Sequence, residues 1–157
     1  MVLDCGLSLC YYAGKEGKYN VIVIDYYGLN LSYRLKQCGN FKLKTFVMVA
    51  DQMLKRVEYL HRKGYIHRNL QPNKFILGRN QTVKRIYLIG LSMAKKWSKN
   101  NVHIPYREGK KIKGNIIYQS INAHLHIELS RRDDLESLVY CWAKFLLGKL
   151  PWEGEKE

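Results

Sequence analysis

Residues 65–97 read YIHRNLQPNKFILGRNQTVKRIYLIGLSMAKKW. A polar loop, His67 to Lys74, opens this stretch and carries a proline near its end. It is followed by the apolar run Ile86 to Ile89, which leads into a turn at Gly90. A short apolar run bounded by turn residues is typical of a buried strand. The stretch therefore predicts a polar loop, then a short buried strand and a tight turn.

The same residues resemble the catalytic loop and the metal-binding turn of protein kinases. In kinases, His-Arg-Asp-x-x-x-x-Asn supplies a general base and a magnesium ligand, and a later Asp-Phe-Gly supplies a second metal-binding carboxylate. Here the corresponding positions are His67-Arg68-Asn69, Lys74 and Gly90-Leu91-Ser92. The spacing of the kinase motif is kept, whereas the reactive groups are replaced.

Further blocks of sequence are similar to the casein kinase 1 family, in which Ser-Ile-Asn stands where most kinases have Ala-Pro-Glu. They are residues 94–97, 103–108, 120–125 and 130–138. The chain resembles that family over nearly its whole length. The resemblance implies an α+β fold, a partial protein-kinase-like fold that consists mainly of the helical large lobe with a two-stranded remnant of the small lobe.

The expected organisation is one partial kinase-like domain over residues 1–157, with a small-lobe remnant and hinge at 1–28 and an incomplete large lobe at 29–157. We expect the chain to be truncated, without the Gly-rich loop, the strand lysine with its glutamate partner, or the last helices of the large lobe. The central helix would then leave apolar surface open, which indicates a partner or a tendency to aggregate.

Periodicity predicts the main elements. Alternation and flanking turn residues predict a hairpin, and apolar residues at helical spacing predict the helices. The expected strands are Leu7–Tyr12 and Tyr19–Ile24, joined by a turn at 13–18, and the expected helices are 29–38, 42–63 and 134–147.

Four positions decide the catalytic expectation. Asn69 takes the general-base position and cannot accept a proton, and Gln71 takes the position of a lysine that would neutralise the transferred phosphoryl group. Lys74 would repel magnesium rather than bind it, and Gly90 offers no ligand. We therefore expect no metal site and no intact catalytic residue.

The resemblance also implies a vestigial adenine and hinge region and a set of structural residues. The hinge region would comprise Ile24, Asp25, Tyr26, Tyr27 and Ile76. ATP and magnesium would be cofactors only if the chain were a working kinase. Structural roles fall to His67, Arg68 and Asp134, of which Asp134 would hold the backbone of the catalytic loop.

Charge and composition limit the classes of partner that we expect. Lys plus Arg number 27 against 13 Asp plus Glu, for a formal charge of +14, which favours acidic partners. Lys110, Lys111 and Lys113 could attract acidic segments, form a nuclear-import patch or simply be solvated charge, while Ile117 replaces an arginine that resembles a phosphate clamp. No nucleic-acid motif accompanies the charge, so we do not expect nucleic acid as a partner.

The compartment expected from the sequence is intracellular, either cytoplasmic or nuclear. The start of the chain lacks the features of a signal peptide, and no run is long enough to span a membrane. Free thiols in a reducing compartment are expected because the cysteines fit neither a zinc pattern nor a disulfide framework. They are Cys5, Cys10, Cys38 and Cys141.

Three functions remain open from the sequence. The first is a catalytically inactive casein kinase 1-like protein, a pseudokinase that acts, if at all, by binding kinase partners or acidic substrates. The second is a working serine/threonine kinase of the same family that transfers phosphate from ATP to protein. The third is a gene fragment with no function, because drift would also erode catalytic positions.

Overall fold

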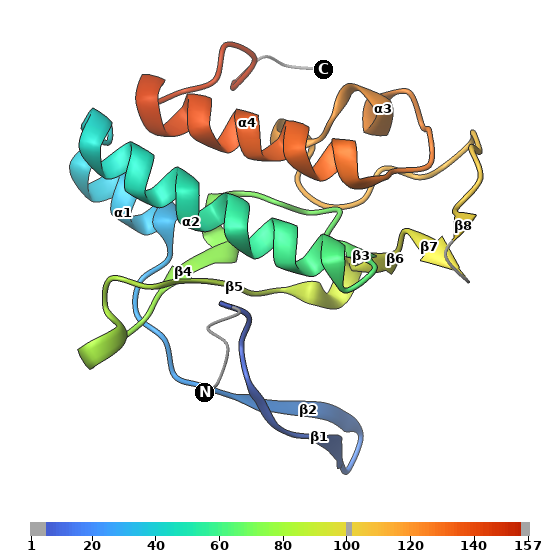
Figure 1. Cartoon of the computed structure of the whole chain (residues 1–157), viewed down its shortest axis with the longest axis horizontal. Helices are drawn as coiled ribbons and strands as arrows, with labels where there is room; N and C mark the ends of the chain where they lie inside the picture. Colours follow the sequence, from blue (N-terminus) through green and yellow to red (C-terminus); the bar gives the residue numbers. More distant parts are fainter. Residues whose placement is uncertain (1–5, 100–101, 155–157) are drawn as a thin grey trace.

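The computed structural model of the chain describes residues 6–99 and 102–154. A helical body contains α1 (Leu31–Cys38), α2 (Leu43–Arg62), α3 (Ile121–His124) and α4 (Arg131–Leu147). Figure 1 shows α4 lying along α2, short strands on the other side of α2, and a hairpin that extends away from the body. This is an α+β arrangement of helices and small two-stranded sheets.

The hairpin pairs β1 (Cys10–Glu16) with β2 (Tyr19–Ile24) in antiparallel register. The predicted bounds of the first strand and of the turn were wrong, because β1 starts later and runs on until only Gly17 and Lys18 separate the strands. Gly17 has a φ of 58°, which a two-residue hairpin turn requires and which glycine adopts without strain. Leu7 instead forms an isolated bridge with Leu88.

The helices α1 and α2 precede the polar loop in the chain. α1 starts at Leu31, two residues later than predicted, because the Asn30 side chain accepts a hydrogen bond from the Tyr33 backbone N–H at 2.9 Å and caps the helix. α2 was predicted within one residue at each end, and Gly64 follows it with a φ of 84°. The residues of α2 that face the core are Met53, Val57 and Leu60.

α4 packs on α2 and begins at Arg131, three residues earlier than predicted. The earlier start follows from a capping box, in which the Asp133 carboxylate accepts from the Ser130 backbone N–H at 2.7 Å. Leu138, Cys141 and Phe145 of this helix are fully buried. The Phe145 ring lies 4.9 Å from that of Phe41, which ties the end of α4 to the start of α2.

Short strands carry the polar loop. β3 (Tyr65–Ile66) pairs with β6 (Lys95–Lys96), and β4 (Phe75–Leu77) pairs with β5 (Ile86–Leu88). The apolar run predicted as a buried strand is β5, whose Ile86 and Leu88 are each 1% exposed. A further pair joins β7 (Ser98–Lys99) to β8 (Val102–His103). The loop that follows β3 is thus fixed at both ends by strand pairing.

The outer face of α4 carries exposed apolar side chains, as the sequence predicted. Leu135, Val139 and Leu146 are 42%, 53% and 40% exposed. Cys10, Cys38 and Cys141 are free thiols in the structure. The fourth cysteine, Cys5, lies outside the described residues. Within the described part, no helix is both long and apolar enough to cross a membrane.

Replacing Leu138 by alanine tests the α2–α4 core. Leu138 is 0% exposed, so Leu138→Ala removes buried methyl groups and leaves a cavity, and should lower the free energy of unfolding by about 2–5 kcal/mol. Val139→Ala, one residue on and half exposed, should change it by less than about 0.5 kcal/mol. Urea denaturation measures both, and equal losses would contradict this packing.

Candidate functional site

The polar loop follows β3 and ends in a short 3-10 turn, Pro72–Lys74. Its backbone is unusual at one residue. Arg68 has a φ of 64°, in the left-handed region that side chains other than glycine rarely adopt. Its guanidinium Nε donates to the Met93 carbonyl at 2.6 Å. Such a conformation persists only where surrounding contacts hold it.

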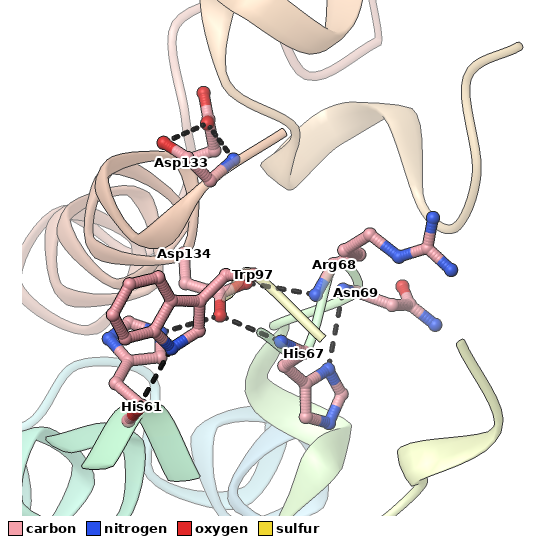
Figure 2. Close-up of polar contacts among 8 residues, drawn as sticks. His61, His67, Arg68, Asn69, Trp97, Asp133 and Asp134 are labelled. Atoms are coloured by element: carbon pink, nitrogen blue, oxygen red, sulfur yellow. Dashed lines mark hydrogen bonds and ion pairs between the residues drawn. The ribbon is translucent and has the colours of Figure 1, made fainter. Parts of the chain in front are cut away.

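Asp134 supplies those contacts. Its carboxylate accepts hydrogen bonds from the backbone N–H groups of His67 at 2.7 Å and Arg68 at 2.9 Å, and lies 2.8 Å from His61 Nε2. Asp134 is 2% exposed, and Figure 2 shows it between His61 and the loop. A carboxylate at the start of α4 therefore fixes the loop through main-chain atoms.

His67 is a fully buried residue of the loop. It is 0% exposed; its Nε2 lies 3.1 Å from the Ile89 carbonyl, and its Nδ1 accepts from the Asn69 N–H at 3.3 Å. Burial lowers the pKa of His67, and the charge of Lys74 lowers it further, against the opposing effects of the Ile89 carbonyl and Asp134. The lowered pKa favours the neutral ring, and because the Ile89 carbonyl can only accept, the tautomer that fits both contacts has its proton on Nε2.

The two positions that would bind metal in a kinase contact each other. A Cβ placed on Gly90 would lie 3.2 Å from Lys74 Nζ and 3.0 Å from Lys74 Cδ, so the lysine side chain covers the glycine. Gly90 has a φ of 81°. Among residues 6–99 and 102–154, no cluster of three or more His, Cys, Asp or Glu could hold a metal ion. A cation beside a residue without ligand atoms does not fit magnesium.

Asn69 belongs to a network of amides. Its Oδ1 accepts from Gln71 Nε2 at 3.0 Å and from the Asn115 backbone N–H at 3.2 Å. Asn115 Nδ2 donates to Gln71 Oε1 at 3.0 Å. Asn69 and Gln71 are 7% and 9% exposed, so these bonds form away from water. The position of a catalytic base is thus occupied by a neutral, mutually bonded set of side chains.

Two residues of this network were missed by sequence reasoning. They are Asn115 and Gln119. Gln119 Nε2 donates to the carbonyls of Lys113 at 2.7 Å and Arg68 at 3.2 Å, which joins segment 113–119 to the loop. The available signal was the presence of amide side chains at Asn69, Gln71, Asn115 and Gln119 in two separate loop segments.

A basic cavity of about 180 Å³ lies beside Arg68 and is lined by Lys95, Lys110, Lys111 and Lys113. Glu128 lies at its wall, with its carboxylate 2.8 Å from Lys95 Nζ and 3.4 Å from Lys110 Nζ. Burial raises the pKa of Glu128, but hydrogen bonds and charge from these lysines outweigh burial and lower it overall. The cavity keeps an excess of positive charge. Ile117, by contrast, presents its backbone carbonyl to Trp152 Nε1 at 2.9 Å.

The expected hinge residues lie apart from this cavity. Ile24 and Tyr26 are 43% and 84% exposed, and Tyr26 lies under the Arg79 guanidinium at 4.4 Å. Asp25 accepts hydrogen bonds from Tyr11 at 2.6 Å and Tyr27 at 3.3 Å. Ile76, on β4, is half-buried and pairs with Asn30. The hinge side chains are therefore occupied by contacts within the chain or open to solvent.

A comparison with known families identifies the class of protein. The family model described as protein tyrosine and serine/threonine kinase matches residues 7–157. The match covers nearly the whole chain, including the loop, the turn at Gly90 and α4. The chain belongs to the protein tyrosine and serine/threonine kinase family.

Asp134→Asn tests the anchor of the loop. The substitution places an amide where the carboxylate now faces three donors, which leaves buried N–H groups unpaired, and should lower the free energy of unfolding by about 3–5 kcal/mol. Asp51→Asn, which only breaks the exposed pair with Lys55, should cost about 0.5 kcal/mol. Equal effects in chemical denaturation would refute the anchoring role.

The pKa of His67 makes stability depend on pH. Because the folded-state pKa is lowered, the unfolded state binds the proton first, and stability falls as pH drops below about 6.5 toward the folded pKa. The slope contributed by His67 should approach about 1.4 kcal/mol per pH unit at most. Melting temperatures from pH 8 to 5 should show a shallower decline for His67→Phe and an unchanged decline for the exposed control His124→Gln.

Proposed function

We propose that this kinase-family protein is a catalytically inactive member of the casein kinase 1 group, a pseudokinase that binds protein partners. One observation carries the proposal: the Lys74 side chain covers Gly90, with Nζ 3.2 Å from where a side chain at position 90 would begin. Both positions serve magnesium in a working kinase. Lys74 places a positive charge at the site, and Gly90 provides no carboxylate.

The chemistry of the neighbouring residues supports the same conclusion. Phosphoryl transfer depends on positioning and on neutralisation of developing charge by metal ions and cations. The Asn69 amide has no basicity to accept a substrate proton, and Gln71 brings no charge. No catalytic residue, nucleotide or metal cofactor is therefore assigned to the chain.

The proposal of the casein kinase 1 group rests on the role of its Ser-Ile-Asn block. Ser120 Oγ and Asn122 Nδ2 each donate to Asp133 Oδ1 at 2.8 Å. Asp133 also caps α4, as Figure 2 shows. The Ser-Ile-Asn block therefore joins segment 120–125 to α4, the helix that anchors the loop. The side chains of Ser120 and Asn122 suit this contact because both can donate to Asp133. We assign residues 1–28 to the small lobe and hinge, and residues 29–157 to the large lobe.

Acidic protein segments are the partners that the basic cavity favours. Arg68, Lys111 and Lys113 line it without an acidic partner of their own in the described part of the chain, whereas Lys95 and Lys110 share Glu128. Lysines attract carboxylate or phosphate as point charges and do not need the bidentate clamp that Ile117 cannot make. Kinase partners and acidic substrates both fit this requirement.

The amide network favours a retained protein over a decayed gene fragment. Random replacement of the residues at these positions would leave buried polar groups unpaired, at a cost of about 1–3 kcal/mol each. Here Asn69, Gln71 and Asn115 bond to one another. Three replacements that satisfy each other are consistent with a fold maintained after catalysis was lost.

A phosphoryl-transfer assay tests the proposal. The purified chain, with ATP and either magnesium or manganese, should not label a serine-containing acidic peptide above background. Ile76→Arg, which would block the expected adenine floor, serves as the control for a contaminating kinase. Labelling that is present in the native chain and lost in Ile76→Arg would overturn the proposal.

The same samples report on nucleotide binding. A ligand at about 100 times its dissociation constant stabilises a protein by about 2.7 kcal/mol. Excess Mg-ATP should produce no such shift in the melting temperature. A shift with Mg-ATP would show metal-assisted nucleotide binding and would contradict the reading of Lys74 and Gly90.

A further inference from the structure

A second concave surface lies on the side of the molecule where α2, α4 and β8 meet. It is a groove of about 730 Å³, within the usual range for ligand sites. Leu54 of α2 and Leu135 of α4 lie in its wall and are 43% and 42% exposed, while Trp97 lies between the helices and His103. We call this surface the α2–α4 groove. None of the residues that line the basic cavity lines it.

A stacked arginine gives the groove a fixed positive group. The Arg131 guanidinium lies 3.7 Å from the centroid of the Trp97 ring, and Trp97 Nε1 donates to the His61 carbonyl at 2.9 Å. In residues 6–99 and 102–154, Arg131 forms no ion pair with an acidic side chain. A guanidinium held by an aromatic face loses less freedom when it binds a carboxylate.

The other charges of the groove do not neutralise Arg131. Glu58 is the acidic side chain in the groove wall, and it pairs with Arg62 at 2.6 Å. Arg132 lies 3.9 Å from Asp133, whose oxygens already accept from Ser120, Asn122 and Ser130. The groove therefore has a net positive charge beside an apolar wall.

We propose that the α2–α4 groove binds an acidic protein segment that carries an apolar side chain. A carboxylate of the segment makes a bidentate pair with Arg131, and Arg132 adds a second cation. The apolar side chain packs between Leu54 and Leu135, which are otherwise open to water. This interaction requires neither nucleotide nor the state of the catalytic positions, so it is independent of the proposed lack of catalysis.

Charge and ring geometry favour a peptide over nucleic acid. Single-stranded nucleic acid binds by stacking bases on free aromatic faces along a basic track. Arg131 already covers one face of the Trp97 ring. The cations of the groove lie beside the aliphatic side chains of Leu54 and Leu135 rather than beside free aromatic rings. A mixed acidic and apolar segment matches both properties.

A fluorescein-labelled peptide, Asp-Glu-Leu-Leu-Glu-Asp, is the probe, and fluorescence anisotropy at fixed ionic strength is the measurement. Arg131→Ala should weaken binding about tenfold, because a charge-assisted pair is lost. Leu135→Ser should weaken it about fivefold through lost apolar contact. Lys149→Ala and Val139→Ser make the matched changes at exposed positions outside the groove, and should change affinity less than about twofold.

Several outcomes would overturn the proposal. They are no measurable binding of the peptide by the native chain, equal losses in Arg131→Ala and Lys149→Ala, and undiminished affinity for the peptide with Ser-Ser in place of Leu-Leu. Tighter binding of oligothymidylate that is lost in Arg131→Ala would assign the groove to nucleic acid instead. Circular dichroism melts of each variant establish that it is folded. Detection of phosphoryl transfer would refute the pseudokinase proposal and leave these results unchanged.

Discussion

The buried carboxylate of Asp134 is the constraint on which the site depends. It accepts from two consecutive backbone N–H groups of the loop and lies against His61 of α2. One side chain thereby joins α4, α2 and the loop, and it holds Arg68 in a backbone conformation that costs about 1–3 kcal/mol. Because it acts on main-chain atoms, this anchor is insensitive to which side chains the loop carries. The loop can therefore keep a kinase-like shape while its chemistry changes.

Neutral amides and one positive charge occupy the positions at which a kinase loop carries its reactive groups. At positions where the resemblance to kinases implies a carboxylate, a lysine and a metal-binding asparagine, the loop has Asn69, Gln71 and Lys74. The amides bond to one another and to Asn115, so none of them requires an ion for compensation. Lys74 lies beside Gly90, and its charge adds to the effect of burial in lowering the pKa of His67. The amide groups of the loop therefore find their hydrogen-bond partners within the chain.

Much of the helical architecture was predictable, because apolar periodicity reports directly on the face that a helix buries. α2 was located within one residue at each end, whereas α1 and α4 started elsewhere because their caps, Asn30 and Ser130, set the first turn. The spacing of the loop gave the positions of Asn69, Lys74 and Gly90. The partners of Gln71 and Gln119 were not predictable, since Asn115 meets Gln71 across 44 positions of sequence. Local pattern cannot identify which amides meet over that separation.

The same limit applies to the groove. Arg131 and Arg132 precede the helix predicted from the sequence and lie in the first turn of α4, where cations are unfavourable against the helix dipole. Only the fold brings Trp97 beneath Arg131 and places Leu54 of α2 in the same groove as Leu135. Asp134 is bonded to the loop that it holds, and Asp133 is bonded to segment 120–125 and lies 3.9 Å from Arg132. The contacts that fix the kinase-like frame therefore leave Arg131 available to an external acid, so anchoring of the loop and exposure of the groove's charge have one structural cause.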